Sequence, residues 1–189
     1  MGTGAWATTL GILLANNGHK TVLWSRTESR ANELMSARVN ERSVPGVKFP
    51  ESMSVTASLE ESLTPADLLI VVVPSVTVRE NIKNIRSSIS PHTNIVCATK
   101  GIEIATGKRM SQVITEELPD FNPDQIGVLS GPNLAPEIAA GNPTTATVAF
   151  PNDQIGEKVQ EQLSSEVFRV YRSEDVTGVE LGGALKNII

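Results

Sequence analysis

Short apolar segments alternate with helical patterns along the whole chain. The apolar segments are Lys20–Trp24, Leu68–Pro74, Asn94–Thr99, Ile126–Ser130, Thr144–Phe150 and Val167–Tyr171. Apolar residues at helical spacing fall between them, within Thr8–Asn17, Glu28–Val39, Val76–Ser88, Lys108–Leu118 and Asp153–Ser164. A continuous run such as LLIVVVP fits a strand buried on both faces of a parallel sheet. The alternation therefore predicts right-handed βαβ units and an α/β fold with a doubly wound, Rossmann-type sheet.

Two further segments complete this description of the chain. The proline and glycine residues of Asn40–Ser52 predict a loop. Ser173–Ile189 begins with a cap candidate and acidic residues, as a helix start should, and it has no stop signal before the last residue. We therefore expect a helix that is still open at Ile189.

The composition supports a packed core and excludes several classes of protein. The chain has 189 residues, of which 40% are apolar, enough for one sizeable domain. Its formal net charge of −5 argues against a general nucleic-acid-binding protein, whose surface would be basic. No run approaches about 20 apolar residues, so no membrane span is expected, and the N-terminus lacks the layout of a signal peptide.

The few cysteine and histidine residues indicate reducing conditions and no metal site. Cys97 is the only cysteine, so no internal disulfide can form, and a cytoplasmic location is expected. Its apolar neighbours favour a buried cysteine on a strand. His19 and His92 lie in turn-like contexts without a partner at metal-ligand spacing, so no metal ligand is predicted.

The chain begins on a glycine-rich turn. Gly2, Gly4 and Ala7 match the G-x-G-x-x-G/A pattern of dinucleotide-binding turns. In such a turn the first glycine permits the tight bend, the second lets the backbone approach a pyrophosphate, and the small third residue lets helix and sheet pack closely. The following helix offers its first amide groups to the phosphates. The strand that normally precedes the turn is missing ahead of Gly2, and a plain glycine-rich loop is the alternative interpretation.

The residue after the second strand of such a fold distinguishes NAD from NADP. An acidic residue there binds the ribose 2′-hydroxyl of NAD, whereas an arginine accommodates the 2′-phosphate of NADP. Trp24 is followed by Ser25-Arg26-Thr27, with no acid before Glu28. Arg26 therefore predicts NADPH as the cofactor, or tolerance of both NADPH and NADH; a solvated arginine at a helix start is the alternative.

Two lysines are the candidates for chemistry. Lys100 follows a predicted strand, and ligands of open α/β sheets bind outside the carboxyl ends of the strands. Lys186 shares one helix face with Gly178 and Gly182, which leaves room beside it for cofactor or substrate. Two neighbouring lysines would lower each other's pKa, so that one could exchange a proton with an alcohol. Close helix packing with an ordinary surface lysine is the alternative.

Five segments occur in an order that is typical of one enzyme family. They are GTGAWATTLGILLANNGHKTVLWSR, VVVPS, ATKGIE, LSGPNLAPEIAAGNPT and FRVYRSEDVTGVELGGALKN. Together they resemble the bacterial-type NAD(P)-dependent glycerol-3-phosphate dehydrogenases, which interconvert glycerol 3-phosphate and dihydroxyacetone phosphate. The resemblance covers nearly all of the chain, although Ala7 stands where the family usually has glycine.

The resemblance implies a role for each matching position. The cofactor, NADPH or NADH, would be bound by Gly2, Gly4, Ala5, Trp6, Ala7, Arg26, Lys100 and Ala135. The substrate would be bound by Lys100, Gly131, Asn133, Lys186 and Asn187. Lys186 falls on the family's general base, and Lys100 would be its catalytic partner.

The resemblance also implies that the chain has two parts. Residues 1–172 would form the NAD(P)-binding domain without its first strand, and residues 173–189 would begin a C-terminal all-helical domain that is otherwise absent. The complete enzyme would serve glycerophospholipid synthesis, and a homodimer is one assembly open to it. Two alternatives remain: a related β-hydroxy acid dehydrogenase, which the SGPNLAPEIAAG and GGALKN segments fit poorly, and a non-catalytic nucleotide-binding module.

Overall fold

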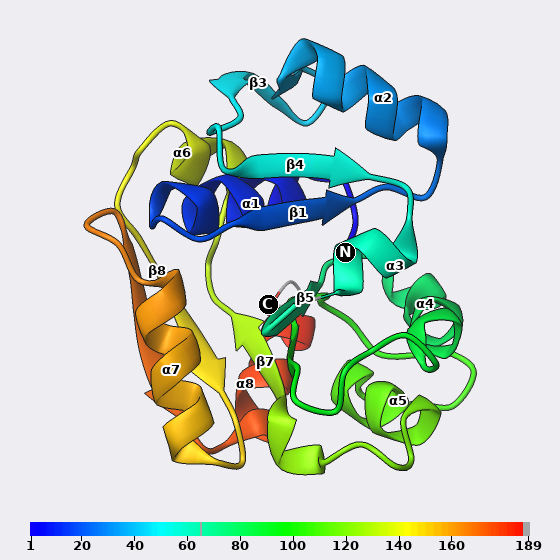
Figure 1. Ribbon diagram of the computed structural model, residues 1–189. Helices are drawn as coiled ribbons and strands as arrows, with labels where there is room; N and C mark the ends of the chain where they lie inside the picture. The colour runs from blue at the N-terminus through cyan, green and yellow to red at the C-terminus, as the bar shows by residue number, and fades with distance from the viewer. Residues whose placement is uncertain (65, 187–189) are drawn as a thin grey trace.

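The computed structural model describes residues 1–64 and 66–186, arranged as in Figure 1. The helices are α1 (Ala5–Asn16), α2 (Glu28–Ala37), α3 (Leu59–Leu63), α4 (Val78–Ile85), α5 (Met110–Glu117), α6 (Ala135–Ala139), α7 (Asp153–Leu163) and α8 (Val176–Leu185). The strands are β1 (Thr21–Trp24), β2 (Val39–Asn40), β3 (Val44–Lys48), β4 (Met53–Thr56), β5 (Leu68–Val71), β6 (Asn94–Cys97), β7 (Ile126–Ser130), β8 (Thr144–Ala149) and β9 (Phe168–Ser173). This alternation confirms the predicted α/β class.

The main sheet has five strands in the order β5-β6-β7-β8-β9. The pairs β5–β6, β6–β7 and β8–β9 are parallel, whereas β7–β8 is antiparallel. The expectation of parallel βαβ units throughout is therefore wrong at this one connection. The connection contains only the five-residue α6, which packs against α1, so it does not cross the sheet and β8 runs back along β7.

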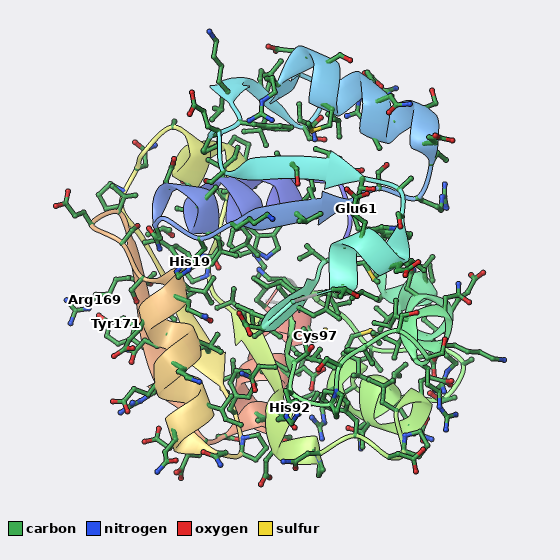
Figure 2. All side chains as sticks on the ribbon, in the orientation of Figure 1. His19, Glu61, His92, Cys97, Arg169 and Tyr171 are labelled. Carbon is green, nitrogen blue, oxygen red and sulfur yellow. The ribbon has the colours of Figure 1, made fainter. Side chains whose placement is uncertain are left out.

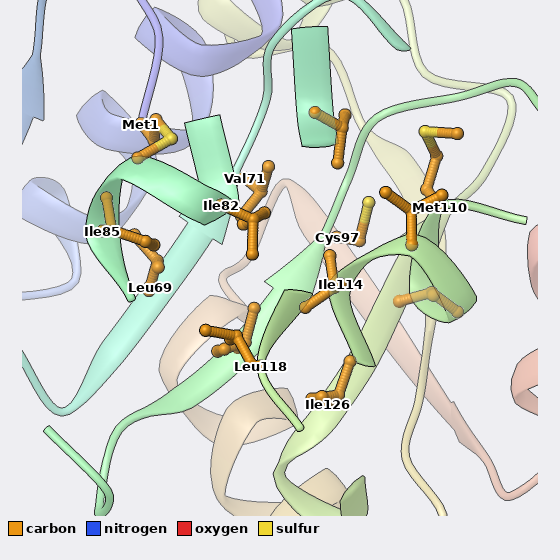
Figure 3. Close-up of a cluster of buried hydrophobic side chains, with 14 of the residues drawn as sticks. Met1, Leu69, Val71, Ile82, Ile85, Cys97, Met110, Ile114, Leu118 and Ile126 are labelled. Carbon is orange, nitrogen blue, oxygen red and sulfur yellow. The ribbon is translucent and has the colours of Figure 1, made fainter. Parts of the chain in front are cut away.

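Helices cover both faces of this sheet. Successive strand residues point to opposite sides, so each buried strand offers apolar side chains to both helix layers. Leu69 and Val71 of β5 face α4 and α5, and Ile70 faces the α1 and α7 side. Figure 3 shows the first of these layers, in which Ile82, Ile85, Ile114 and Leu118 pack around the strand residues. The two layers give the main sheet an apolar core on each face, as a doubly wound sheet requires.

The first two residues bridge the main sheet and a separate parallel pair, β1–β4. The amino group of Met1 donates to the Ile70 carbonyl at 2.7 Å, and the Val72 amide donates to the Met1 carbonyl at 3.1 Å. Gly2 donates to the Trp24 carbonyl at the end of β1. Met1 and Gly2 thus lie between β1 and β5, and beyond them a cavity of about 630 Å³ is lined by β1, β5 and α1.

The segment between α2 and β5 differs most from the expectation. Asn40–Ser52 was expected to be a loop, but it contains the end of β2 and all of β3, and β4 and α3 follow it. β2 and β3 form an antiparallel pair with a shifted register. Their two and five residues are too few to show an apolar period, and Pro45 and Gly46 read as loop residues.

The last described element, α8, ends at Leu185. Its N-cap is Asp175, whose side chain accepts a hydrogen bond from the Gly178 amide. The helix was expected over Ser173–Ile189, and its last three residues lie outside the described part of the chain.

Candidate functional site

The glycine-rich turn has the geometry that a dinucleotide-binding turn needs. Gly2 has a φ of +108°, and a Cβ there would collide with the Val72 carbonyl oxygen. At Gly4, by contrast, a Cβ would have no neighbour within 4 Å, so the backbone is open on that side. α1 begins at Ala5 with no side-chain cap at Gly4. Helix N-termini carry amide groups without an intrahelical partner, which are suited to phosphate.

Ala7 and Trp6 attach this turn to the interior. Ala7 is buried in the cluster formed by α1, β1 and β4, which agrees with the small third residue that close helix packing requires. Trp6 packs edge-on against Phe168 of β9, with the ring centroids 6.2 Å apart. The turn is therefore held against the β1–β4 pair and the main sheet.

A cavity of about 950 Å³ lies in front of the turn. Its lining combines Gly2, Thr3, Gly4, Ala5, Trp6 and Ala7 with Arg26, Lys100 and Asn133. Ligand cavities typically measure roughly 300–1,000 Å³. Open glycine backbone, unpaired helix amides and three cationic side chains, those of Arg26, Arg30 and Lys100, in one cavity of this size fit a dinucleotide with its phosphates.

Arg26 lies where the sequence placed it, directly after β1 and before α2. It is exposed at the cavity, and Thr27 caps α2 by accepting from the Arg30 amide. Arg30 also lines the cavity, and its guanidinium is held by Asn40 Oδ1 and by Glu33, each at 2.6 Å. Sequence reasoning missed Arg30, although its position in the first turn of α2, close to Arg26, was a usable signal.

Lys100 joins the ends of two neighbouring strands. It follows β6, and its Nζ donates to the Gly131 carbonyl, after β7, at 2.9 Å. Partial burial lowers the pKa of Lys100, and the nearby charge of Lys186 lowers it further. The two predicted catalytic lysines therefore lie close enough to interact, with Lys186 exposed just beyond α8.

α8, which leads to Lys186, is fixed by a buried carboxylate that the sequence analysis did not single out. Glu180 accepts hydrogen bonds from the Ser111 amide at 2.8 Å and its hydroxyl at 2.6 Å, and from Arg109 at 2.8 Å. Its side chain is 5% exposed. A single acid in the otherwise apolar stretch VTGVELGGAL was the available signal. The contact ties α8 to the N-terminus of α5.

The predicted glycine face of α8 is only partly open. A Cβ at Gly182 would have no neighbour within 4 Å, which agrees with a free face. At Gly178 the Asp175 side chain fills the space, so that part of the face is closed. The close approach to the sheet is instead made by Gly183, next to Ser130 and Lys100.

The remaining predicted substrate and cofactor residues lie beside the cavity, except for one that falls outside the described residues. Gly131 is packed tightly, because a Cβ there would lie 2.7 Å from the Thr145 carbonyl oxygen. Asn133 lines the cavity and donates to that same carbonyl at 2.7 Å. Ala135 is buried at the start of α6, and its carbonyl accepts from Thr9. Asn187 lies outside the described residues.

The loop after Lys100 is held by an ionic cluster. Arg79 on α4 pairs with Glu103 in this loop at 2.8 Å and with Glu116 and Glu117 of α5. Hydrogen bonds from Arg79 lower the pKa of Glu103 to about 2. The cluster ties the loop after Lys100 to α4 and α5.

Other groups give no sign of a metal or thiol centre in the described residues. No cluster of histidine, cysteine or acidic side chains there could hold a metal ion, and Figure 2 shows His19 and His92 well apart. Burial raises the pKa of the Cys97 thiol to about 12, as expected for an inert strand cysteine. Residues 1–64 and 66–186 contain no helix that is long and apolar enough to cross a membrane.

Comparison with known proteins agrees with this geometry. A family model described as the N-terminus of NAD-dependent glycerol-3-phosphate dehydrogenase matches residues 1–156. The chain is 40% identical over 189 residues to the glycerol-3-phosphate dehydrogenase (NAD(P)+) of Chlorobium limicola, covering 100% of this chain and 57% of that protein. For the enzyme of the same name from Carboxydothermus hydrogenoformans the identity is 43% and the coverage 100% and 56%.

A solved structure gives the same result. The crystal structure of glycerol-3-phosphate dehydrogenase from Coxiella burnetii superposes with a TM-score of 0.92 at 36% identity, over 99% of this chain and 56% of that one. The chain thus spans a little over half the length of its relatives. Since the family model covers most of its residues, the chain belongs to the NAD-dependent glycerol-3-phosphate dehydrogenases, of which it matches the N-terminal part.

Proposed function

We propose that this chain forms the cofactor-binding part of an enzyme that interconverts sn-glycerol 3-phosphate and dihydroxyacetone phosphate with NADPH or NADH. The observation that carries the proposal is the single cavity in which the turn Gly2–Ala7, Arg26 and Lys100 meet. A positively charged cavity with open helix amides suits the several phosphates of such a cofactor and substrate. The family match supports this substrate pair.

The bound nicotinamide would supply hydride transfer, and the residues of the chain would position the reactants and handle one proton. The α1 amides and the glycine backbone bind the pyrophosphate, while Arg26 contacts the ribose 2′-phosphate. Lys100 holds the substrate oxygen or phosphate near the ends of β6 and β7. Lys186 takes the hydroxyl proton during oxidation and returns it during reduction. Gly131, Asn133, Ala135 and Asn187 complete the surroundings of substrate and cofactor.

The division of the chain follows from these roles. Residues 1–172 act as the cofactor-binding domain, and residues 173–189 deliver Lys186 and lead into the part of the enzyme that the relatives carry beyond this chain. We place the enzyme in the cytoplasm, in glycerophospholipid synthesis, without a nucleic-acid partner, and a homodimer is one assembly open to the full-length enzyme. The single, buried Cys97 supports a reducing compartment.

Two measurements test the proposal. The first is titration of this chain with NADPH, followed through the fluorescence of Trp6 and Trp24, which both line the cavity. We expect saturable quenching. The second is reduction of dihydroxyacetone phosphate by a chimera in which the remaining part of the Chlorobium limicola enzyme follows Ile189. A Lys100→Gln chimera is the matched control, since it removes the charge but keeps the bulk.

The outcomes separate the alternatives. Turnover with dihydroxyacetone phosphate, lost in the Lys100→Gln chimera, supports the proposal. Turnover only with β-hydroxy acids would identify the related dehydrogenase instead. Quenching by NADPH without turnover of any hydroxy or keto substrate would indicate a nucleotide-binding module.

A further inference from the structure

Asn40 is a fully buried amide next to the glycine-rich turn, in a segment that was expected to be a loop. Its exposed fraction is 0%. Its Nδ2 donates to the Thr3 carbonyl at 3.0 Å and to Thr8 Oγ1 at 2.9 Å. Its Oδ1 accepts from Arg30 at 2.6 Å. A buried amide with three partners has a fixed orientation and a high cost of disruption.

Arg30 determines which way this amide points. A guanidinium only donates hydrogen bonds, so the atom of Asn40 that faces Arg30 must be the oxygen. The NH₂ group is thereby turned toward Thr3 and Thr8. Arg30 is itself held by Glu33, at 2.6 Å, and it lines the cavity beside Arg26.

The bond to Thr3 fixes one peptide unit of the turn. A trans peptide is planar, and its C=O and N–H point in opposite directions. Because Asn40 holds the Thr3 carbonyl on the buried side, the Gly4 N–H of the same unit points away from Asn40. Gly4 and Thr3 both line the cavity, whereas Asn40 lies behind them.

We infer that Asn40 is a positioning residue, which aims the Gly4 amide at the cofactor's pyrophosphate by holding the Thr3 carbonyl. The inference rests on the proposed function, since it presumes a dinucleotide in the cavity. Without the bond to Asn40, the Thr3–Gly4 peptide unit can rotate. The Thr3 carbonyl oxygen would then point toward the cavity, in the place where the Gly4 N–H should meet the phosphate. Asn40 touches neither cofactor nor substrate and acts only through the turn.

The test compares two buried substitutions by calorimetric titration. Asn40→Asp keeps the size and the Arg30 contact but loses both donors and sets a carboxylate against the Thr3 carbonyl. Thr8→Val is the matched control. It removes the hydroxyl that accepts one hydrogen bond from Asn40 Nδ2, and it leaves the bond from Asn40 to the Thr3 carbonyl intact. We expect Asn40→Asp to weaken NADPH binding about tenfold or more, and Thr8→Val to change it less than about threefold.

A second ligand separates positioning from general damage. Adenosine carries neither the pyrophosphate nor the 2′-phosphate, so its binding should be the same in Asn40→Asp and in the original chain. Loss of both ligands in Asn40→Asp, or of neither, would overturn the inference. If the original chain binds no NADPH, the proposed function fails and the inference fails with it.

A measurement on the unaltered chain remains decisive if Asn40→Asp does not fold. In ¹H–¹⁵N spectra the Gly4 amide should shift on addition of NADPH and exchange more slowly with solvent. Adenosine should leave it unchanged. A Gly4 amide that is insensitive to NADPH would refute the role of Asn40 even where binding itself is normal.

Discussion

Gly183 of α8 lies so close to Ser130 at the end of β7 that a Cβ on Gly183 would overlap Ser130 Oγ and lie 3.2 Å from Ser130 Cβ. The same Cβ would lie 3.9 Å from Cγ of Lys100. The absence of a side chain at one position of α8 thus sets the distance between the helix that leads to Lys186 and the strand ends that carry Lys100.

The first prediction compares this glycine with its neighbour. Gly183→Ala should lower the free energy of unfolding by about 1–3 kcal/mol, as overpacking typically does. Gly182→Ala should raise it by about 0.5–1 kcal/mol, because alanine favours the helix and nothing lies within 4 Å of the new methyl group. Urea denaturation measures both values.

A second substitution checks the cause. Ser130→Ala removes the overlapping oxygen, so it should recover part of the stability lost in Gly183→Ala. If the two glycine variants were equally stable, or if Ser130→Ala gave no recovery, close packing of α8 on β7 would not be the reason for Gly183.

The sequence revealed those parts of the fold that depend on repeated local patterns. Apolar runs such as Leu68–Pro74 and the glycine spacing of Gly2 and Gly4 are properties of neighbouring residues, so they predicted the sheet, the turn and the strand-end location of Lys100. The antiparallel return of β8 was not predictable in this way, because it depends on α6 packing against α1 rather than crossing the sheet.

Long-range polar contacts left almost no trace in the sequence. Asn40 pairs with Thr3, and Glu180 with Ser111, across separations that no local pattern encodes. The short strands β2 and β3 escaped for a related reason, since tertiary pairing stabilises them more than their own composition does. Gly183 was overlooked because the choice among three nearby glycines depends on what faces each of them.

The second prediction concerns cofactor preference. Arg26→Asp should raise the Kd for NADPH roughly 10- to 100-fold, as expected for loss of a charge-assisted bond, and should change the Kd for NADH far less. Calorimetric titration of both cofactors measures the ratio. Lys158→Asp, on the exposed side of α7, makes the same charge change away from the cavity and serves as the control. Equal losses for both cofactors would show that Arg26 does not read the 2′-phosphate.

The third prediction concerns the effect of pH on stability. Burial lowers the pKa of the Met1 amino group to about 5, from an ordinary value of about 8. Between these values the unfolded chain binds a proton that the folded chain does not, so stability rises with pH across this window. The rise is at most about 1.4 kcal/mol per pH unit. It is complete above pH 8 and lost as the pH falls toward 5.

Acetylation of the N-terminus provides the control for this effect. The acetyl group removes the titrating amine, and the adjacent cavity of about 630 Å³ has room for it. Thermal unfolding between pH 5 and 8 should therefore depend less on pH in the acetylated chain. Parallel curves for the two forms would assign the pH dependence to other groups.

The fourth prediction assigns different roles to the two lysines in the chimera. Lys186→Ala should lower kcat by about 10²–10⁴-fold, the usual loss for a general acid–base group, while NADPH still binds. Lys186→Arg should not restore turnover, because a guanidinium stays protonated and cannot accept the hydroxyl proton. Lys100→Ala should raise the KM for dihydroxyacetone phosphate as well as slow turnover. Steady-state kinetics on the three variants measures this split.

The pH profile adds a test of the interaction between Lys100 and Lys186. Burial and the charge of Lys186 lower the pKa of Lys100, so its positive charge is lost at a lower pH than for an exposed lysine. The KM for the anionic substrate should therefore rise with pH as Lys100 loses its proton. In Lys186→Ala the nearby charge is gone, the pKa of Lys100 returns toward its ordinary value, and the rise in KM should move to higher pH. A rise that stays in place would mean that the two lysines do not interact, and near-normal kcat in Lys186→Ala would require another proton donor.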